Sequence, residues 1–202
     1  MDTGQIILVV TIALSSYAAM HYYLYRKLLW VFPRHKKAIV ISLVVLAGLF
    51  FIVISLTRIG LSYSVTPLAW VWSIWIGYVF IFFVFAGTLD IAIKFAYFFG
   101  KDFVLLHIKQ RTKTIFSSGV VVLICVAGFI SAQQVNILSY TLVTTKLEQP
   151  ITIVQISDLH LGLLSRETHI QKLVDNINAL QPDIIVSTGD LVDVQVDHLD
   201  DY

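Results

Sequence analysis

The stretch from Ile151 to Asp193 reads Ile-Thr-Ile-Val-Gln-Ile-Ser-Asp-Leu-His-Leu-Gly, then a helical segment, then Pro-Asp-Ile-Ile-Val-Ser-Thr-Gly-Asp-Leu-Val-Asp. Two short runs rich in β-branched residues, Ile151–Ile156 and Ile184–Val186, flank the helical segment, a pattern typical of a strand–helix–strand unit. The connection between the two runs is long enough for a helix. We therefore expect the strands to be parallel neighbours in one sheet.

An amphipathic helix is expected between the two strands. Ser165 is suited to cap its first turn, in which Glu167 also lies. Gln181-Pro182 predicts its end, because proline disfavours helical geometry in the preceding residue. Apolar residues recur between these points at spacings of three and four and form one stripe: Ile170, Leu173, Val174, Ile177 and Leu180.

Each expected strand is followed by a turn that carries candidate metal ligands. Asp158 and His160 follow the first strand, and Asp190 follows the second. The carboxyl ends of parallel strands meet at one edge of a sheet, so we expect these three side chains to converge. Carboxylates suit Mg²⁺ or Mn²⁺, and an added imidazole extends the choice to Fe and Zn²⁺. An isolated Asp-Leu-His or Gly-Asp is more often an ordinary solvated turn; their joint placement favours a metal site.

The composition indicates a membrane protein. Hydrophobic residues make up 57% of the 202 residues and charged residues 13%, whereas soluble domains carry about 25% charged residues. Four uncharged, mostly apolar segments are long enough to cross a bilayer: 3–25, 38–56, 68–89 and 114–134. We predict a four-helix transmembrane region over 1–134, followed by a partial α/β domain over 135–202.

Both ends of the expected membrane region have further features. Asp2 and the absence of a nearby cation favour a retained first helix over a cleaved signal peptide. Val135–Leu147 alternates loosely between apolar and polar residues and predicts a strand at a sheet edge, with Pro150 as a break before the next strand. Cys125 is the single cysteine, which excludes an intrachain disulfide and a cysteine-based zinc site.

Basic residues are concentrated in two of the expected loops. Residues 26–37 hold five Lys and Arg and residues 94–113 hold another five, whereas the loop between the second and third segments holds only Arg58. The positive-inside rule places the two basic loops in the cytoplasm and the C-terminal part on the extracytoplasmic side of the cell membrane.

Asp90 and Lys94 follow the third segment at i,i+4 spacing and can pair on one helix face. Their position favours a helix end whose charged groups reach the membrane interface over a functional ion pair inside the membrane.

The runs Ile-Ser-Asp-Leu-His-Leu-Gly (156–162) and Ser-Thr-Gly-Asp-Leu-Val-Asp (187–193) resemble the first two signature blocks of the calcineurin-like metallophosphoesterases. The apolar region ahead of them looks like that of the membrane-associated branch of this superfamily. The resemblance covers residues 135–202 and is specific over 151–193. It implies the β-α-β start of a β-sandwich that is flanked by helices.

The resemblance also implies a site with two divalent metal ions, which in this family can be Mn, Fe, Zn or Mg. Asp158 and His160 would bind the first ion, and Asp190 would bridge both. Gly189 would bring Asp190 close to the ions without a Cβ in the way. Asp193 matches less clearly, and an indirect role or plain solvation suits it as well as ligation. His169 and His198 match no motif, and His169 fits the solvated face of the helix.

The sequence departs from the family in one respect. The later blocks, Gly-Asn-His-Glu or -Asp, a further His, and Gly-His-x-His, are absent from the 202 residues. They supply the remaining metal ligands and a His near the leaving group. We therefore expect the chain to be an N-terminal piece of a longer protein and to lack full activity by itself.

The function implied is that of a membrane-anchored phosphoesterase, which hydrolyses a phosphomonoester, phosphodiester or pyrophosphate with water activated by two metal ions. A location beside the bilayer makes a lipid-linked phosphate a candidate substrate. The alternative is a non-catalytic four-span membrane protein with a relic or interaction tail. The acidic tail lacks the ligand spacing of a calcium-binding EF-hand loop. Nucleic-acid binding has no support, because the cations lie in membrane loops and the C-terminal part is acidic.

A reporter enzyme fused after Glu148 tests the expected topology. We expect a reporter that works only outside the cytoplasm to be active, because the ten basic residues of the two loops hold those loops inside. A matched fusion to a reporter that works only in the cytoplasm should be inactive. The opposite pair of results would contradict the topology.

Overall fold

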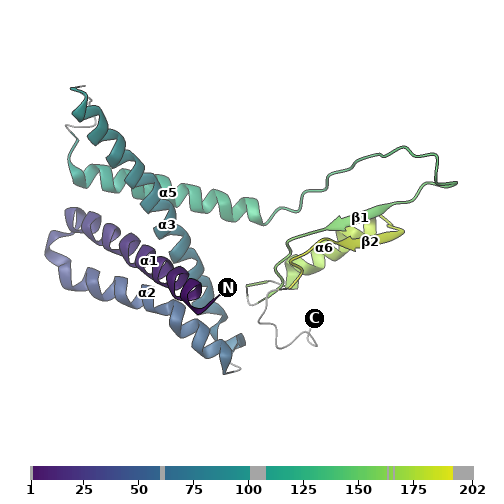
Figure 1. Cartoon of the computed structure of the whole chain (residues 1–202), viewed down its shortest axis with the longest axis horizontal. Helices are drawn as coiled ribbons and strands as arrows, with labels where there is room; N and C mark the ends of the chain where they lie inside the picture. The colour runs from purple at the N-terminus through teal and green to yellow at the C-terminus, as the bar shows by residue number, and fades with distance from the viewer. Residues whose placement is uncertain (1, 60–61, 101–107, 163, 166, 193–202) are drawn as a thin grey trace. The chain divides into compact units, whose positions relative to one another are not determined.

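The computed structural model describes residues 2–59, 62–100, 108–162, 164–165 and 167–192. Its contacts divide the chain into two units, Met1–Ile52 with Trp70–Gly128, and Val53–Ala69 with Phe129–Tyr202. The elements in chain order (Figure 1) are α1 (Thr3–Val31), the 3-10 helix η1 (Pro33–His35), α2 (Lys36–Arg58), α3 (Ser62–Phe98), α5 (Gln110–Ala132), β1 (Ile153–Ile156), α6 (Glu167–Ala179) and β2 (Ile184–Ser187).

Four helices are long and apolar enough to cross a membrane, as predicted: Thr3–Val31, Pro33–Arg58, Ser64–Phe98 and Gln110–Ala132. Their apolar side chains are mostly exposed, which suits contact with lipid tails rather than water. The prediction of four apolar helices is confirmed by length and composition. The predicted boundary between domains, after residue 134, stays a prediction.

The helices extend beyond the predicted segments. The sequence placed a polar turn over 57–67, but α3 begins at Ser62 and contains Pro67. A proline so near the start of a helix removes only one intrahelical hydrogen bond. At its other end α3 runs to Phe98, so Lys94 lies in a helix. Lys113 likewise lies in the first turns of α5 rather than in a loop.

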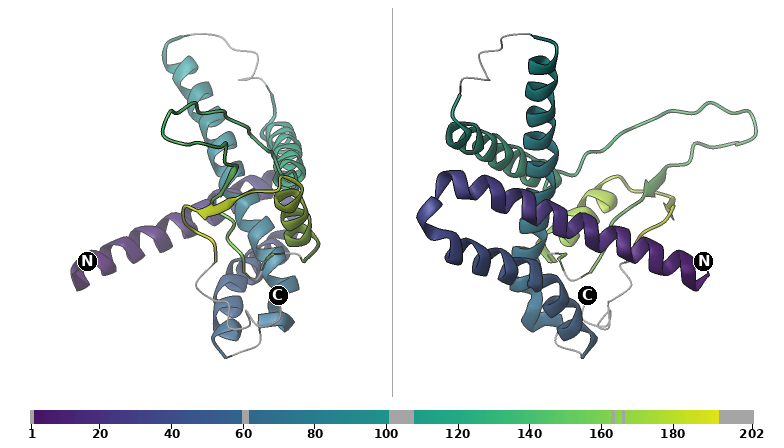
Figure 2. Two further views of the ribbon diagram at one scale, coloured as in Figure 1. Left: turned by 90° about the vertical axis from the view of Figure 1, so that its right-hand side faces the viewer. Right: turned by 60° about the vertical axis from the view of Figure 1, so that its left-hand side comes forward.

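Within the first unit, α1 and the following part of α2 form a helical hairpin that is joined through η1 (Figures 1 and 2). Apolar side chains from several helices pack into its core. These buried residues are Leu24 of α1, Ile39 and Leu43 of α2, Val79, Phe82 and Ala86 of α3, and Val121 of α5.

Polar side chains connect the helices of this unit. The Trp75 indole donates to Nε2 of His21 at 3.0 Å, and Nδ1 of His21 lies 2.9 Å from the carbonyl oxygen of Tyr17. The Tyr17 hydroxyl donates to the carbonyl of Ala47 in α2. The Tyr78 hydroxyl of α3 donates to Ser118 of α5. Such bonds stabilise helix packing in lipid, where an unpaired polar group is costly.

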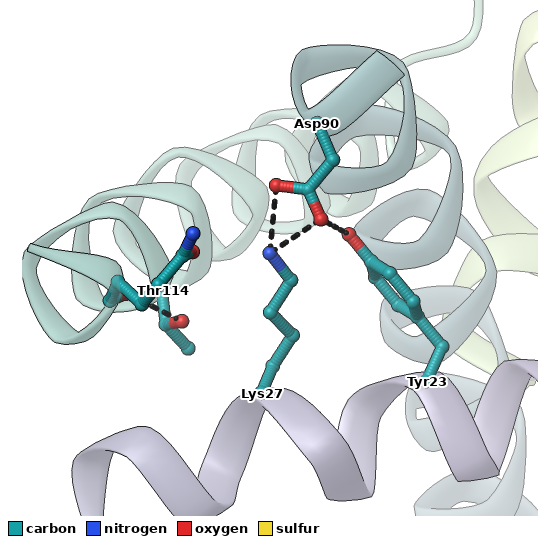
Figure 3. A network of polar contacts seen from close by, with 5 residues as sticks. Tyr23, Lys27, Asp90 and Thr114 are labelled. Carbon is teal, nitrogen blue, oxygen red and sulfur yellow. Dashed lines mark hydrogen bonds and ion pairs between the residues drawn. The ribbon is translucent and has the colours of Figure 1, made fainter. Parts of the chain in front are cut away.

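Asp90 pairs with α1 and not with Lys94, so the predicted i,i+4 pair is wrong. Nζ of Lys27 lies 2.8 Å from Oδ1 and 2.6 Å from Oδ2 of Asp90, and the Tyr23 hydroxyl donates to Oδ2 at 2.9 Å (Figure 3). Lys27 is buried, whereas Lys94 is exposed. Packing of α1 against α3 therefore places the buried Lys27 beside the Asp90 carboxylate, whereas Lys94, one turn further along α3, stays exposed.

In the second unit, β1 and β2 form a two-stranded parallel sheet, which confirms that the strands are parallel neighbours. The register pairs Ile153 with Ile184 and continues to Ile156 with Ser187. The connecting helix α6 lies beside the strands (Figures 1 and 2). Larger parts of a phosphoesterase domain are not confirmed.

The segment 134–152 is irregular, so the strand predicted over Val135–Leu147 is wrong. Its apolar side chains are exposed, and Leu142 and Val143 are 91% and 96% exposed. The alternation of the sequence suits a strand, but a strand forms only when it pairs with another. Among the described residues, β1 and β2 pair only with each other, and this segment pairs with neither.

Replacing Lys27 with Met tests the link between α1 and α3. We expect the free energy of unfolding in detergent to fall by about 2 kcal/mol. This is less than the roughly 3–5 kcal/mol of a fully buried pair, because the Asp90 side chain is 26% exposed. Lys94→Met is the matched control and should change stability little. A larger loss for Lys94→Met than for Lys27→Met would contradict the pairing.

Candidate metal centre

The parallel hydrogen bonding of β1 and β2 continues beyond both strands. The Thr188 amide donates to the Ile156 carbonyl, and the Asp158 amide donates to the Gly189 carbonyl. The His160 amide then donates to the Asp190 carbonyl at 3.0 Å. The backbones of the two turns are thus bonded directly to each other, which fixes their relative position.

This backbone pairing brings the three candidate ligands together. One ligand atom each of Asp158, His160 and Asp190 lies within 4.8 Å of the corresponding atoms of the other two. All three side chains are exposed. The structure thus has the three side chains close together after the carboxyl ends of the strands, as expected. Metal binding by these residues stays a prediction.

The donor set suits a divalent cation. Ligand atoms that bind one ion at about 2.1 Å can lie up to about 4.2 Å apart. Small side-chain rotations would therefore bring the three groups to binding distance. Two carboxylates and one imidazole fit ions from Mg²⁺ and Mn²⁺ to Fe and Zn²⁺.

The backbone of the candidate ligands is unusual. Among the described residues, four non-glycine residues have positive φ: Asp158 (55°), His160 (46°), Gln181 (46°) and Asp190 (45°). Three of these four are the candidate ligands. The conformation costs roughly 1–3 kcal/mol per residue and persists where the surroundings impose it, often at functional sites. Here the bonds between the two turns impose it.

The backbone angle gives a reason for glycine at position 189. Its φ is 136°, a conformation that residues with a Cβ rarely adopt. Among the described residues, apart from Gly189 and its two chain neighbours, no atom lies within 4 Å of the position that a Cβ would take. The expected close approach of this turn to metal ions stays a prediction.

Ser165 supports the turn of His160 instead of capping the helix, which corrects the expected role. Its Oγ accepts from the Gly162 amide at 2.8 Å and lies 3.4 Å from the carbonyl oxygen of His160. The helix α6 begins later, at Glu167. The sequence predicted that Ser165 bonds to the helix that follows it, whereas Ser165 bonds to the turn that precedes it.

Three further side chains near the ligands were not predicted. The Ser157 hydroxyl donates to Oδ2 of Asp158 and so orients this carboxylate. The side-chain amide of Gln155 donates to Thr188 Oγ1 across the strands. The available signal was that Ser157 directly precedes Asp158 and Thr188 directly precedes Gly189. Asp193 and His198 lie outside the described residues, and His169 is half-buried on α6.

Replacing Gly189 with Ala tests the role of its backbone angle. We expect the turn to be destabilised by roughly 1–3 kcal/mol, with faster hydrogen exchange of the Asp158 and His160 amides. Gly119→Ala, in the middle of α5 with open space around it, is the matched control. Equal exchange rates in the Gly189 variant and the unmodified chain would contradict the argument.

Comparison with known proteins gives partial similarity to metallophosphoesterases. The chain is 36% identical over 56 residues to an uncharacterized metallophosphoesterase of Campylobacter jejuni, which covers 28% of this chain and 15% of that protein. It is 30% identical over 91 residues to a transmembrane protein with metallophosphoesterase domain from Danio rerio, which covers 43% of this chain and 21% of that protein.

The similarity is limited in extent. The matched segments span about a fifth or less of the length of these two relatives. No family model matches the chain, and no solved structure matches it. The findings indicate a membrane protein with a loose relationship to the metallophosphoesterases, in which a group of acidic and histidine side chains is available for a divalent metal ion.

Proposed function

We propose that this chain is the membrane-anchoring and first metal-binding part of a metal-dependent phosphoesterase. The observation that carries the proposal is the approach of Asp158, His160 and Asp190 to within 4.8 Å. The two named relatives, one of them a transmembrane protein, support the same reaction class.

The residues of the chain have separable roles in this proposal. Asp158 and His160 come from one turn and would bind a first ion. Asp190 comes from the other turn and would bind that ion or a second one. Ser157 fixes the orientation of the Asp158 carboxylate by its hydrogen bond. When bound, divalent ions polarise a phosphoryl oxygen and activate water for attack on phosphorus.

The backbone holds these groups close together without a bound ion. The amide-to-carbonyl bonds between the turns use main-chain atoms only, so they fix the positions of the three residues without using their side-chain ligand atoms. Preorganised ligands lose less conformational entropy on binding. The exposure of all three side chains allows a phosphoester to approach the bound ions.

The substrate is a phosphomonoester, a phosphodiester or a pyrophosphate. A membrane protein places such a site near lipid headgroups, so a lipid-linked phosphate is one candidate. The extracytoplasmic location of the site is part of the proposal and follows from the basic loops of the sequence.

Mn²⁺ binding to the purified chain in detergent micelles tests the ligand set. We expect Asp158→Asn, His160→Ala and Asp190→Asn each to weaken binding by at least about tenfold, since even supporting residues of metal sites have effects of about 10–100-fold. His169→Ala is the matched control for histidine and Glu148→Gln for a carboxylate. Affinity should also fall on acidification, because the imidazole must be neutral to donate to the ion. Equal affinity in the ligand variants and the controls would contradict the site.

Hydrolysis by the full-length gene product with Mn²⁺ tests the reaction itself. We expect the protein to hydrolyse phosphomonoester or phosphodiester reporter substrates, and chelators should abolish this activity. Asp190→Ala should lower the rate by at least about a hundredfold, which corresponds to about 2.7 kcal/mol. Metal binding without any hydrolysis would favour the non-catalytic membrane protein instead. Equal hydrolysis by the Asp190 variant would remove this residue from the reaction.

A further inference from the structure

The first unit contains a second site of different chemistry. A cavity of about 270 Å³ lies between the end of α1, the end of α3 and the start of α5. Its charged lining residues are Arg26, Lys27, Lys94, Lys113 and Asp90. None of them belongs to the candidate metal centre, so this site is independent of the proposed phosphoesterase function.

The cavity carries a surplus of positive charge. Asp90 is its single carboxylate among the described lining residues, and it is bound by Lys27 and by the Tyr23 hydroxyl (Figure 3). Among the residues that the structure describes, Arg26 donates only to the neutral Tyr22 hydroxyl. Arg26, Lys94 and Lys113 therefore leave three positive charges without a counter-charge in the described part of the cavity.

Lys113 is the most buried of the cations that lack a counter-charge. The residue is only 7% exposed, and within the described residues its ammonium group has neither a hydrogen-bond acceptor nor an acidic partner. It also lies in the first turns of α5, where the helix dipole contributes partial positive charge. An anion in the cavity would compensate the charge of this ammonium group and that of the helix end.

The position of the cavity selects the class of anion. Arg26 lies one residue after the predicted membrane segment 3–25, Lys94 five residues after 68–89, and Lys113 one residue before 114–134. These positions correspond to the depth of lipid headgroups. Trp30, a residue type enriched at this depth, lines the same cavity and is 57% exposed. Basic pockets between membrane helices bind phosphate-containing headgroups in this way.

We propose that this cavity binds the phosphate headgroup of an anionic lipid, preferably a phosphomonoester such as that of phosphatidic acid. Three uncompensated cations match the two negative charges of a phosphomonoester better than the single charge of a phosphodiester. Lys113 and Lys94 donate to the phosphate oxygens, and the α5 amides at the start of the helix add to the favourable field. Lys27 holds Asp90 away from the anion.

Binding of fluorescent phosphatidic acid to the purified chain in neutral detergent micelles tests this inference. We expect tighter binding than for phosphatidylcholine, and a loss of about tenfold in Lys113→Gln, as for one charge-assisted hydrogen bond. Lys94→Gln provides a second variant at an exposed position, where folding is not at stake. Lys146→Gln, an exposed cation of the irregular segment, is the matched control. Helix content by circular dichroism confirms that each variant is folded.

Three results would overturn the inference. Equal losses in Lys113→Gln, Lys94→Gln and Lys146→Gln would show a non-specific charge effect. Equal binding of phosphatidic acid and phosphatidylcholine would remove the preference for phosphate charge. Displacement of the lipid by inorganic phosphate at comparable concentration would assign the cavity to a free phosphate rather than to a headgroup. Mn²⁺ binding should be unchanged in all of these variants, which separates this site from the metal centre.

Discussion

The hydrogen bonds between the two turns after β1 and β2 are the constraint on which the candidate metal centre depends. They run from Asp158 to Gly189 and from His160 to Asp190, and they use only main-chain atoms. They hold three residues with positive φ in place without using their side-chain atoms. A sheet of only two short strands is marginal by itself, so this backbone pairing, and not a packed core, gives the ligands their proximity.

The membrane helices are organised on a different principle. Their cores are apolar, but packing in lipid gains little from apolar contacts alone. Specific polar links set which helices meet: Lys27 with Asp90, Trp75 with His21, and Tyr78 with Ser118. The Lys27–Asp90 link also shapes the cationic cavity, because it neutralises one lysine and leaves the others to attract an anion.

Local patterns in the sequence were sufficient for the four apolar helices, for the strand–helix–strand unit and for the convergence of the three ligands. The remaining features depend on contacts between distant residues. The partner of Asp90 lies on another helix, so spacing along α3 favoured Lys94. The alternation over Val135–Leu147 matched a strand, yet among the described residues this segment pairs with neither β1 nor β2. A glycine at 189 was expected to matter, but its positive φ could be seen only in the structure.

The irregular segment 134–152 has a consequence for the choice of substrate. Fully stretched, this length of polypeptide would reach roughly 60 Å, about twice the thickness of the hydrocarbon layer. The proposed metal centre would therefore be attached to the membrane without being confined to its surface. Anchoring alone would not restrict the proposed phosphoesterase to lipid substrates, because water-soluble phosphoesters away from the bilayer would also be within reach.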